Sequence, residues 1–116
     1  MARGAIPAAA AQLEELSNAI HAHPELNYEE VFAHGTLTDY LDALPGVDVE
    51  RGYLGLETAF RATAGAGQPV VAICAEYDAL PGIGHACGHN LIAEVCRLCA
   101  IRDNIPSFAP HQWCGC

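Results

Sequence analysis

The sequence has 116 residues, of which 52% are hydrophobic, and it carries a formal net charge of −9. This length suits one small domain with a core of its own. Because the excess of carboxylates repels phosphate groups and anionic lipid heads, we expect neither nucleic acid nor a membrane surface as a partner.

Two helices are predicted at the beginning of the chain. Between about residues 8 and 22, apolar side chains recur with the spacing of one helical face; they are Leu13, Leu16, Ala19 and Ile20. Pro24 ends this helix, because the residue before a proline is pushed out of the helical region. A second apolar stripe, from about Tyr28 to Leu44, predicts another helix, which Pro45-Gly46 terminates.

Three strands and a further helix follow. Alternation of apolar and polar residues predicts a strand from about Val47 to Tyr53, and another runs from Thr58 to Thr63. The run VVAICA after Pro69 is typical of a strand that is buried on both faces. A helix is expected from about Asn90. This order of elements predicts an α/β fold with a central sheet.

The chain divides near Val95. Residues 8–95 carry the regular patterns, whereas residues 96–116 form a cysteine-rich tail that we expect to pack loosely, because its helical period fades after about Ile101. No apolar run approaches the ~20 residues that span a bilayer. The short alanine stretch at the start runs directly into Glu14 and Glu15, which argues against a secretory signal. We therefore expect reduced thiols and a cytoplasmic location.

Most of the side chains that carry chemistry lie in residues 76–90, EYDALPGIGHACGHN. This segment follows the apolar strand, and ligands of open α/β sheets bind at the carboxyl ends of strands. Cys87 and His89 are candidate metal ligands, because thiolate and imidazole both suit Zn²⁺. Asp78 is a candidate for orienting the imidazole or a bound water. Glu76 lies on the same strand face as Asp78.

Other interpretations stay open. Cys87 can be a buried thiol, and His85 and His89 can be core or capping histidines. These interpretations explain the same residues without a metal. The glycines at 82, 84 and 88 suggest a phosphate loop, but the Walker lysine and the Rossmann spacing are missing. Two alternatives concern the tail cysteines. One is a structural zinc knuckle formed by Cys96, Cys99, Cys114 and Cys116, with His111 nearby, and the other is a redox pair formed by Cys96 and Cys99.

Segment 76–90 resembles the signature of the M20 family of metallopeptidases and amidohydrolases. It is most similar to the aminoacylase-1-like, dipeptidase-like branch, and more distantly to the hippurate and auxin-conjugate hydrolases. Two further segments, HAHPELNYEE at 21–30 and LETAFRA at 56–62, are similar to motifs of that family in the same order. The resemblance covers about Leu13 to Val95.

The resemblance implies the N-terminal part of a zinc-peptidase-like catalytic domain, with two helices, then a mixed sheet and a further helix. It also implies hydrolysis of amide bonds in N-acyl amino acids, dipeptides or similar small conjugates, with a divalent ion, Zn²⁺ or Mn²⁺, as cofactor. By matching position, Cys87 and His89 are metal ligands and Asp78 is the orienting aspartate. Glu76 stands where other branches of the family carry a ligating histidine.

The chain departs from the family pattern after Val95. In the family, the glutamate that transfers protons belongs to a Glu-Glu pair on a later strand, and no such pair follows Asn90. The later metal ligands and the domain through which the family homodimerises are also absent. Glu94 is expected to be a surface residue. We therefore expect a truncated product that is inactive by itself.

Overall fold

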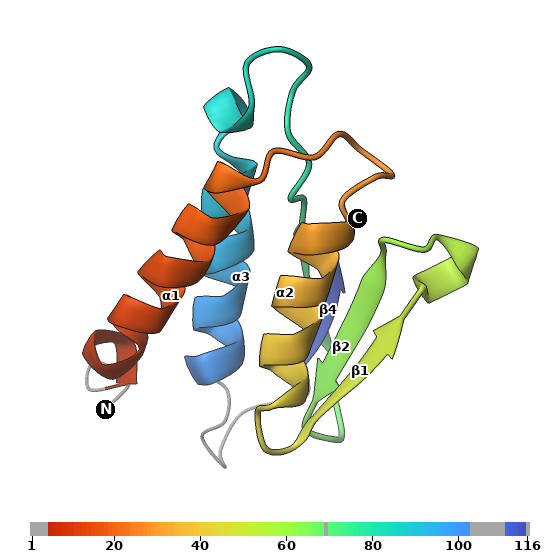
Figure 1. The fold of residues 1–116 in the computed structure, drawn as a ribbon. Helices are drawn as coiled ribbons and strands as arrows, with labels where there is room; N and C mark the ends of the chain where they lie inside the picture. Colours follow the sequence, from red (N-terminus) through yellow and green to blue (C-terminus); the bar gives the residue numbers. More distant parts are fainter. Residues whose placement is uncertain (1–4, 69, 103–110, 116) are drawn as a thin grey trace.

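The computed structural model describes residues 5–68, 70–102 and 111–115. In chain order the elements are α1 (Ala5–Ala22), α2 (Val31–Asp42), β1 (Val47–Arg51), β2 (Phe60–Ala64), β3 (Val71–Ala75), α3 (His89–Arg102) and β4 (His111–Gly115) (Figure 1). The predicted α/β order of two helices, three strands and a helix is confirmed, and a fourth strand is added. Among the described residues, no helix is long and apolar enough to cross a membrane.

The four strands form one mixed sheet in the order β1-β2-β4-β3. Strand β2 pairs antiparallel with both β1 and β4, whereas β4 pairs parallel with β3. Helix α3 therefore connects two neighbouring parallel strands, as the crossover of a β-α-β unit does. The carboxyl end of β3 leads directly into segment 76–90.

Strand β4 lies within the tail, residues 96–116, and the loose packing expected of that tail stays a prediction. Helix α3 continues past Val95 to Arg102, and residues 111–115 occupy a central position in the sheet. A strand between two others pairs its backbone N–H and C=O groups on both sides, which does not require a strong local apolar pattern. The boundary at Val95 itself stays a prediction.

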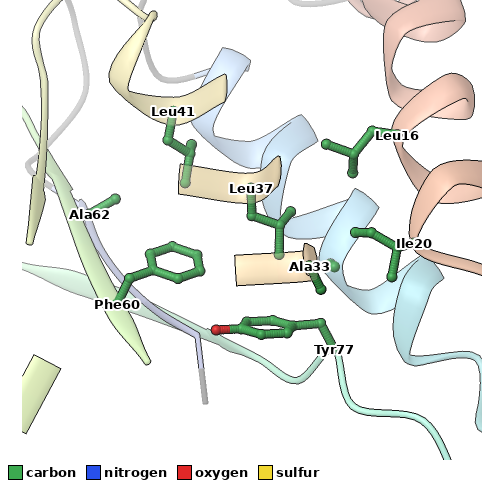
Figure 2. Close-up of a cluster of buried hydrophobic side chains, with 9 residues drawn as sticks. Leu16, Ile20, Ala33, Leu37, Leu41, Phe60, Ala62 and Tyr77 are labelled. Carbon is green, nitrogen blue, oxygen red and sulfur yellow. The ribbon is translucent and has the colours of Figure 1, made fainter. Parts of the chain in front are cut away.

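The core lies between the three helices and one face of the sheet. Figure 2 shows it from close by; its largest members are Leu16, Ile20, Leu37, Leu41, Phe60 and Tyr77. Tyr77, just beyond β3, is only 1% exposed, and its ring stacks on that of Phe60 with the ring centroids 6.0 Å apart. The segment after β3 is therefore anchored in the core through Tyr77.

Strand β3 is not buried on both faces, as its apolar run predicted. Ala72 and Cys74 are exposed, whereas Ala75 is buried. The reason is the arrangement of the layers: all three helices lie on one side of the sheet (Figure 1), and β3 is at the edge of the described sheet. No described helix covers the other face.

Helix α2 begins at Val31, three residues later than predicted. Tyr28 has a φ of 69°, in the left-handed region, and so lies outside the helix. The carboxylate of Glu25 accepts hydrogen bonds from the N–H groups of Phe32 and Ala33, at 2.8 and 3.0 Å. These donors belong to the first turn, where no helical carbonyl is within reach. A side chain from outside the helix therefore defines its beginning.

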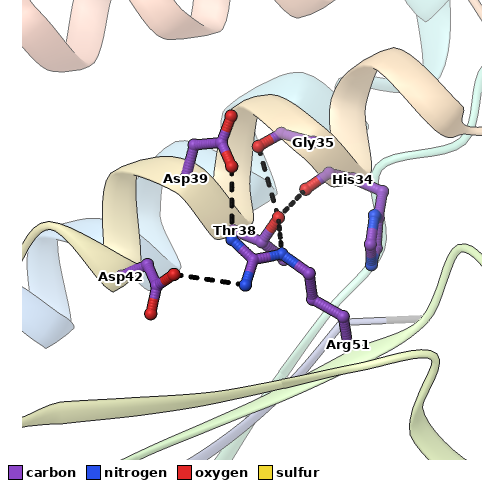
Figure 3. A network of polar contacts seen from close by, with 6 residues as sticks. All are labelled: His34, Gly35, Thr38, Asp39, Asp42 and Arg51. Atoms are coloured by element: carbon purple, nitrogen blue, oxygen red, sulfur yellow. Dashed lines mark hydrogen bonds and ion pairs between the residues drawn. The ribbon is translucent and has the colours of Figure 1, made fainter.

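Arg51 connects the other half of α2 to β1. Its guanidinium group forms ion pairs with Asp39 and Asp42, each at 3.2 Å, and its Nε donates to the Thr38 hydroxyl at 3.1 Å (Figure 3). The two carboxylates are largely exposed, so this network contributes little to the net free energy of unfolding. Its fixed fork geometry orients the helix over the sheet.

Candidate functional site

The site begins where β3 ends. Tyr77 points into the core (Figure 2), and its hydroxyl donates a hydrogen bond to the backbone oxygen of Thr58. Because side chains alternate along extended chain, Glu76 and Asp78 lie on the opposite side, and both line one cavity. The predicted shared face of these two carboxylates is confirmed. The Ala79 N–H donates to the backbone oxygen of Glu25 at 2.7 Å, which fixes the segment against the loop before α2.

A tight turn brings the later part of the segment back over Asp78. The backbone of Leu80 pairs with that of Gly84, and a short 3₁₀ turn, His85–Cys87, precedes α3. Gly88, between Cys87 and His89, has a φ of +80°, which glycine adopts without steric cost. This bend lets two side chains that are two residues apart approach the same point.

Asp78 is that point. The Nδ1 of His89 lies 2.7 Å from Oδ1 of Asp78 and 3.0 Å from its backbone oxygen. The Cys87 thiol donates to the same backbone oxygen at 3.7 Å. With Nδ1 turned to a carboxylate, which only accepts, the imidazole presents Nε2 to a ligand. The structure therefore brings Asp78, Cys87 and His89 together, and their metal-binding roles stay a prediction.

This donor set suits a divalent ion but does not complete a site. Thiolate and imidazole are zinc ligands, and a carboxylate behind the imidazole is the usual supporting group. Among the residues that the structure describes, no three His, Cys, Asp or Glu side chains form a group that could hold a metal. Glu94 is half-buried in α3 and belongs to no such group. A catalytic zinc site normally has three protein ligands.

His85 is a core residue. It is 6% exposed, and neither ring nitrogen has a hydrogen-bond partner among the described residues. Burial lowers the pKa of His85, and the neighbouring His21 and His89 act in the same direction, so the ring is neutral at pH 7. The core interpretation of this histidine therefore agrees with its position.

The sequence interpretation missed two residues beside Asp78. Glu30, which is 2% exposed, accepts a hydrogen bond at 2.7 Å from the hydroxyl of Thr58. Both line the cavity of about 200 Å³ that Glu76 and Asp78 also line. The sequence did contain an indication of both residues, because Glu30 and Thr58 lie in the two family-like motifs at 21–30 and 56–62.

The alternatives for the tail depend on side chains whose positions the structure does not describe, although it describes the backbone of most of these residues. The backbone places Cys96 and Cys99 in α3 and Cys114 in β4. Cys116 lies outside the described chain. The zinc-knuckle and redox interpretations therefore stay predictions.

Comparison with known proteins gives consistent matches over most of the chain. No known protein-family profile matches it. The mouse (Mus musculus) Xaa-Arg dipeptidase is 50% identical over 99 residues, which are 78% of this chain and 23% of that enzyme. One of the subunits of the p-aminobenzoyl-glutamate hydrolase of Escherichia coli K12 is 32% identical over 114 residues, 84% of this chain and 24% of that protein. The chain thus spans about a quarter of the length of these relatives.

A solved structure shares the fold. It is a Bacillus subtilis protein described as a dinuclear metal-binding peptidase of the M20 family, with a TM-score of 0.76 and 22% identity. The match covers 90% of this chain and 34% of the other. The arrangement of helices and sheet in this chain is therefore the same as in that solved structure.

Proposed function

We propose that this chain, whose homologues are dipeptidases and amidohydrolases of the M20 peptidase family, supplies part of the metal site of such a hydrolase. The observation that carries the proposal is the convergence of Cys87 and His89 on Asp78, with 2.7 Å between the imidazole and the carboxylate. The reaction is hydrolysis of an amide bond in dipeptides, N-acyl amino acids or similar small conjugates.

The residues have separate tasks in this proposal. Cys87 and the Nε2 of His89 hold a divalent ion, Zn²⁺ or Mn²⁺, and Asp78 keeps the imidazole in the required tautomer and orientation. When bound, such an ion acts as a Lewis acid on the scissile carbonyl and lowers the pKa of water. Segment 76–90 carries both residues on the turn between β3 and α3.

The names of the relatives support this substrate class. One relative is named for dipeptides that end in arginine, and the other for p-aminobenzoyl-glutamate. Both substrates contain an amide bond to the nitrogen of an amino acid. We propose the same bond for the hydrolase to which this chain contributes.

Metal titration of the 116-residue chain tests the site. Isothermal titration calorimetry with Zn²⁺ and with Mn²⁺ should show one bound ion, and Cys87→Ser and His89→Gln should each abolish this binding. Cys74→Ser, which changes an exposed thiol on β3, is the matched control and should bind normally. Unchanged binding in both ligand variants, or loss of binding only in Cys96→Ser and Cys99→Ser, would disprove the assignment.

Turnover by the same chain should be undetectable. Two ligands leave the described site one short of the three that a catalytic metal normally has. The chain is incubated with dipeptides and N-acyl amino acids in the presence of Zn²⁺ or Mn²⁺, and released amino acid is measured. Robust hydrolysis that disappears in Cys87→Ser would show that the site is complete.

A further inference from the structure

One row of residues crosses the whole sheet on the face opposite the helices. It consists of Glu50 in β1, Arg61 in β2, Cys114 in β4 and Cys74 in β3, each in register with the next. Residues that pair in register on neighbouring strands lie on the same face of a sheet. Phe60, which precedes Arg61 in β2, belongs to the core, so the row lies on the face that no described helix covers (Figure 1).

One end of this row shows that register partners on this face come into contact. The guanidinium group of Arg61 forms an ion pair with the carboxylate of Glu50 at 2.9 Å, across the two strands. The other end of the row holds Cys114 and Cys74, and the Cys74 thiol is exposed. Two cysteines therefore stand at paired positions of neighbouring parallel strands, on a face that solvent reaches at Cys74.

The spacing of neighbouring strands suits a disulfide between these two positions. Paired strands lie ~4.7–4.9 Å apart, and the Cα atoms of disulfide-linked cysteines lie ~4.4–6.8 Å apart. A register pair such as Cys74 and Cys114 can therefore be linked without moving either strand. These are the two cysteines of the described strands, whereas Cys96 and Cys99 belong to α3, on the other side of the sheet.

We propose that Cys74 and Cys114 form a reversible disulfide that links β3 to β4, by exchange with a small disulfide of the glutathione class. The exposed Cys74, as thiolate, attacks one sulfur of oxidised glutathione, which releases one glutathione thiolate and leaves a mixed disulfide on Cys74. The Cys114 thiolate then attacks the Cys74 sulfur and releases the second glutathione. Two protein thiols thus lose two electrons and two protons, and one glutathione disulfide takes them up to become two thiols.

The disulfide fastens the last described strand to the strand that leads into segment 76–90. Because a disulfide removes conformational freedom from the unfolded chain, its formation should lower the unfolding equilibrium constant at least about 30-fold. Urea denaturation of the oxidised and the reduced chain measures this change, and Cys74→Ser should show no such difference between the two conditions. Neither Cys74 nor Cys114 belongs to the candidate metal site, so the inference does not depend on that site.

Peptide mapping tests the pairing itself. The 116-residue chain is incubated with oxidised glutathione and EDTA, the remaining thiols are alkylated, and the chain is cleaved by trypsin after arginine and by Asp-N before aspartate. Residues 62–77 then form a peptide whose single cysteine is Cys74, and residues 103–116 form a peptide with Cys114 and Cys116. We expect mass spectrometry to find these two peptides linked, and dithiothreitol to separate them.

Cys116→Ser is the matched control, because it removes the other thiol of the second peptide and should leave the link intact. Cys74→Ser and Cys114→Ser should each abolish the link. In concentrated urea, where the strands no longer pair, the link should lose its preference over other pairings. Persistence of the link in Cys114→Ser, its loss in Cys116→Ser, or its equal formation in the unfolded chain would overturn the inference. Mixed disulfides alone, or links between two chains alone, would overturn it as well.

Discussion

At the scale of single residues, Asp78 links the candidate ligands to the cavity. Its carboxylate orients His89, its backbone oxygen contacts both His89 and Cys87, and its side chain lines the cavity. A change in Asp78 therefore affects the metal ligands and the cavity together. Cys87 and His89 contact Asp78 and lie outside the lining of that cavity.

Asp78→Ala should weaken Zn²⁺ or Mn²⁺ binding about 10- to 100-fold, because the imidazole of His89 loses the carboxylate that orients it. Calorimetric titration measures the change. Asp48→Asn, which removes an exposed carboxylate on β1, is the control and should bind like the wild type. An affinity within about twofold of wild type in Asp78→Ala would contradict the orienting role, since twofold is well below the ~10-fold minimum expected.

The identity of these residues was predictable, but their contacts were not. The pattern Cys-x-His after an apolar strand predicts Cys87 and His89, and strand alternation predicts the shared face of Glu76 and Asp78. The contact between Asp78 and His89 depends on the turn through Gly84 and Gly88, whose path no periodic pattern encodes. Glu30 was missed because an acidic residue before a helix is usually interpreted as exposed.

At the scale of the elements, the beginning of α2 depends on a side chain six residues upstream. Glu25→Ala should lower the free energy of unfolding by about 1 kcal/mol, because the N–H groups of Phe32 and Ala33 lose their acceptors. Urea denaturation measures the change. Glu29→Ala, at an exposed position that makes neither bond, is the control. Equal destabilisation by the two variants would show that general charge near the helix, rather than capping, is responsible.

The contrast between core and surface contacts on α2 can be tested on the same helix. Leu37 is 3% exposed in the central cluster, so Leu37→Ala should cost about 2–5 kcal/mol. Arg51→Met removes two ion pairs to largely exposed carboxylates and should cost no more than about 1 kcal/mol. Denaturant midpoints compare the two variants. A larger loss in Arg51→Met would mean that the network in Figure 3 outweighs the packing of α2.

The elements themselves were predictable to within a few residues. Apolar periodicity identified α1, α2 and α3, because each buries one face in the same core. Two features of the sheet were not predicted, and the cause is common to both, since burial and pairing are long-range properties. The two-sided burial predicted for β3 depended on a covering layer that the described residues do not supply, and β4 owes its position to pairing with β2 and β3.

At the scale of the whole molecule, the sheet order β1-β2-β4-β3 places the end of the described chain at the centre of the fold. Such an order follows from contacts between distant residues, so local patterns predict the elements but not their arrangement. The net charge of −9 was interpreted only as an exclusion of anionic partners. In the structure, part of this charge gathers at one cavity beside the candidate metal ligands. Distribution of charge, rather than its total, therefore carries the functional information.

The pH dependence of stability should reflect His34, a residue of α2 whose ring packs edge-on against that of Phe60 in β2. Burial lowers the pKa of His34 below its ordinary value of 6.5, while a hydrogen bond to the backbone of Ala59 acts in the opposite direction. The folded state therefore binds a proton less readily than the unfolded state. Between the two pKa values the free energy of unfolding rises with pH, so this stability is present above about 6.5 and is lost as the pH falls.

His34→Gln should consequently show a shallower loss of stability than the wild type between about pH 7 and pH 5, because the titrating group is gone. Urea midpoints at several pH values give the slope. His23→Gln, a change of an exposed histidine in the loop after α1, is the matched control and should keep the wild-type slope. If the slope persists in His34→Gln, or disappears equally in His23→Gln, burial of His34 against Phe60 is not what makes the fold sensitive to acid.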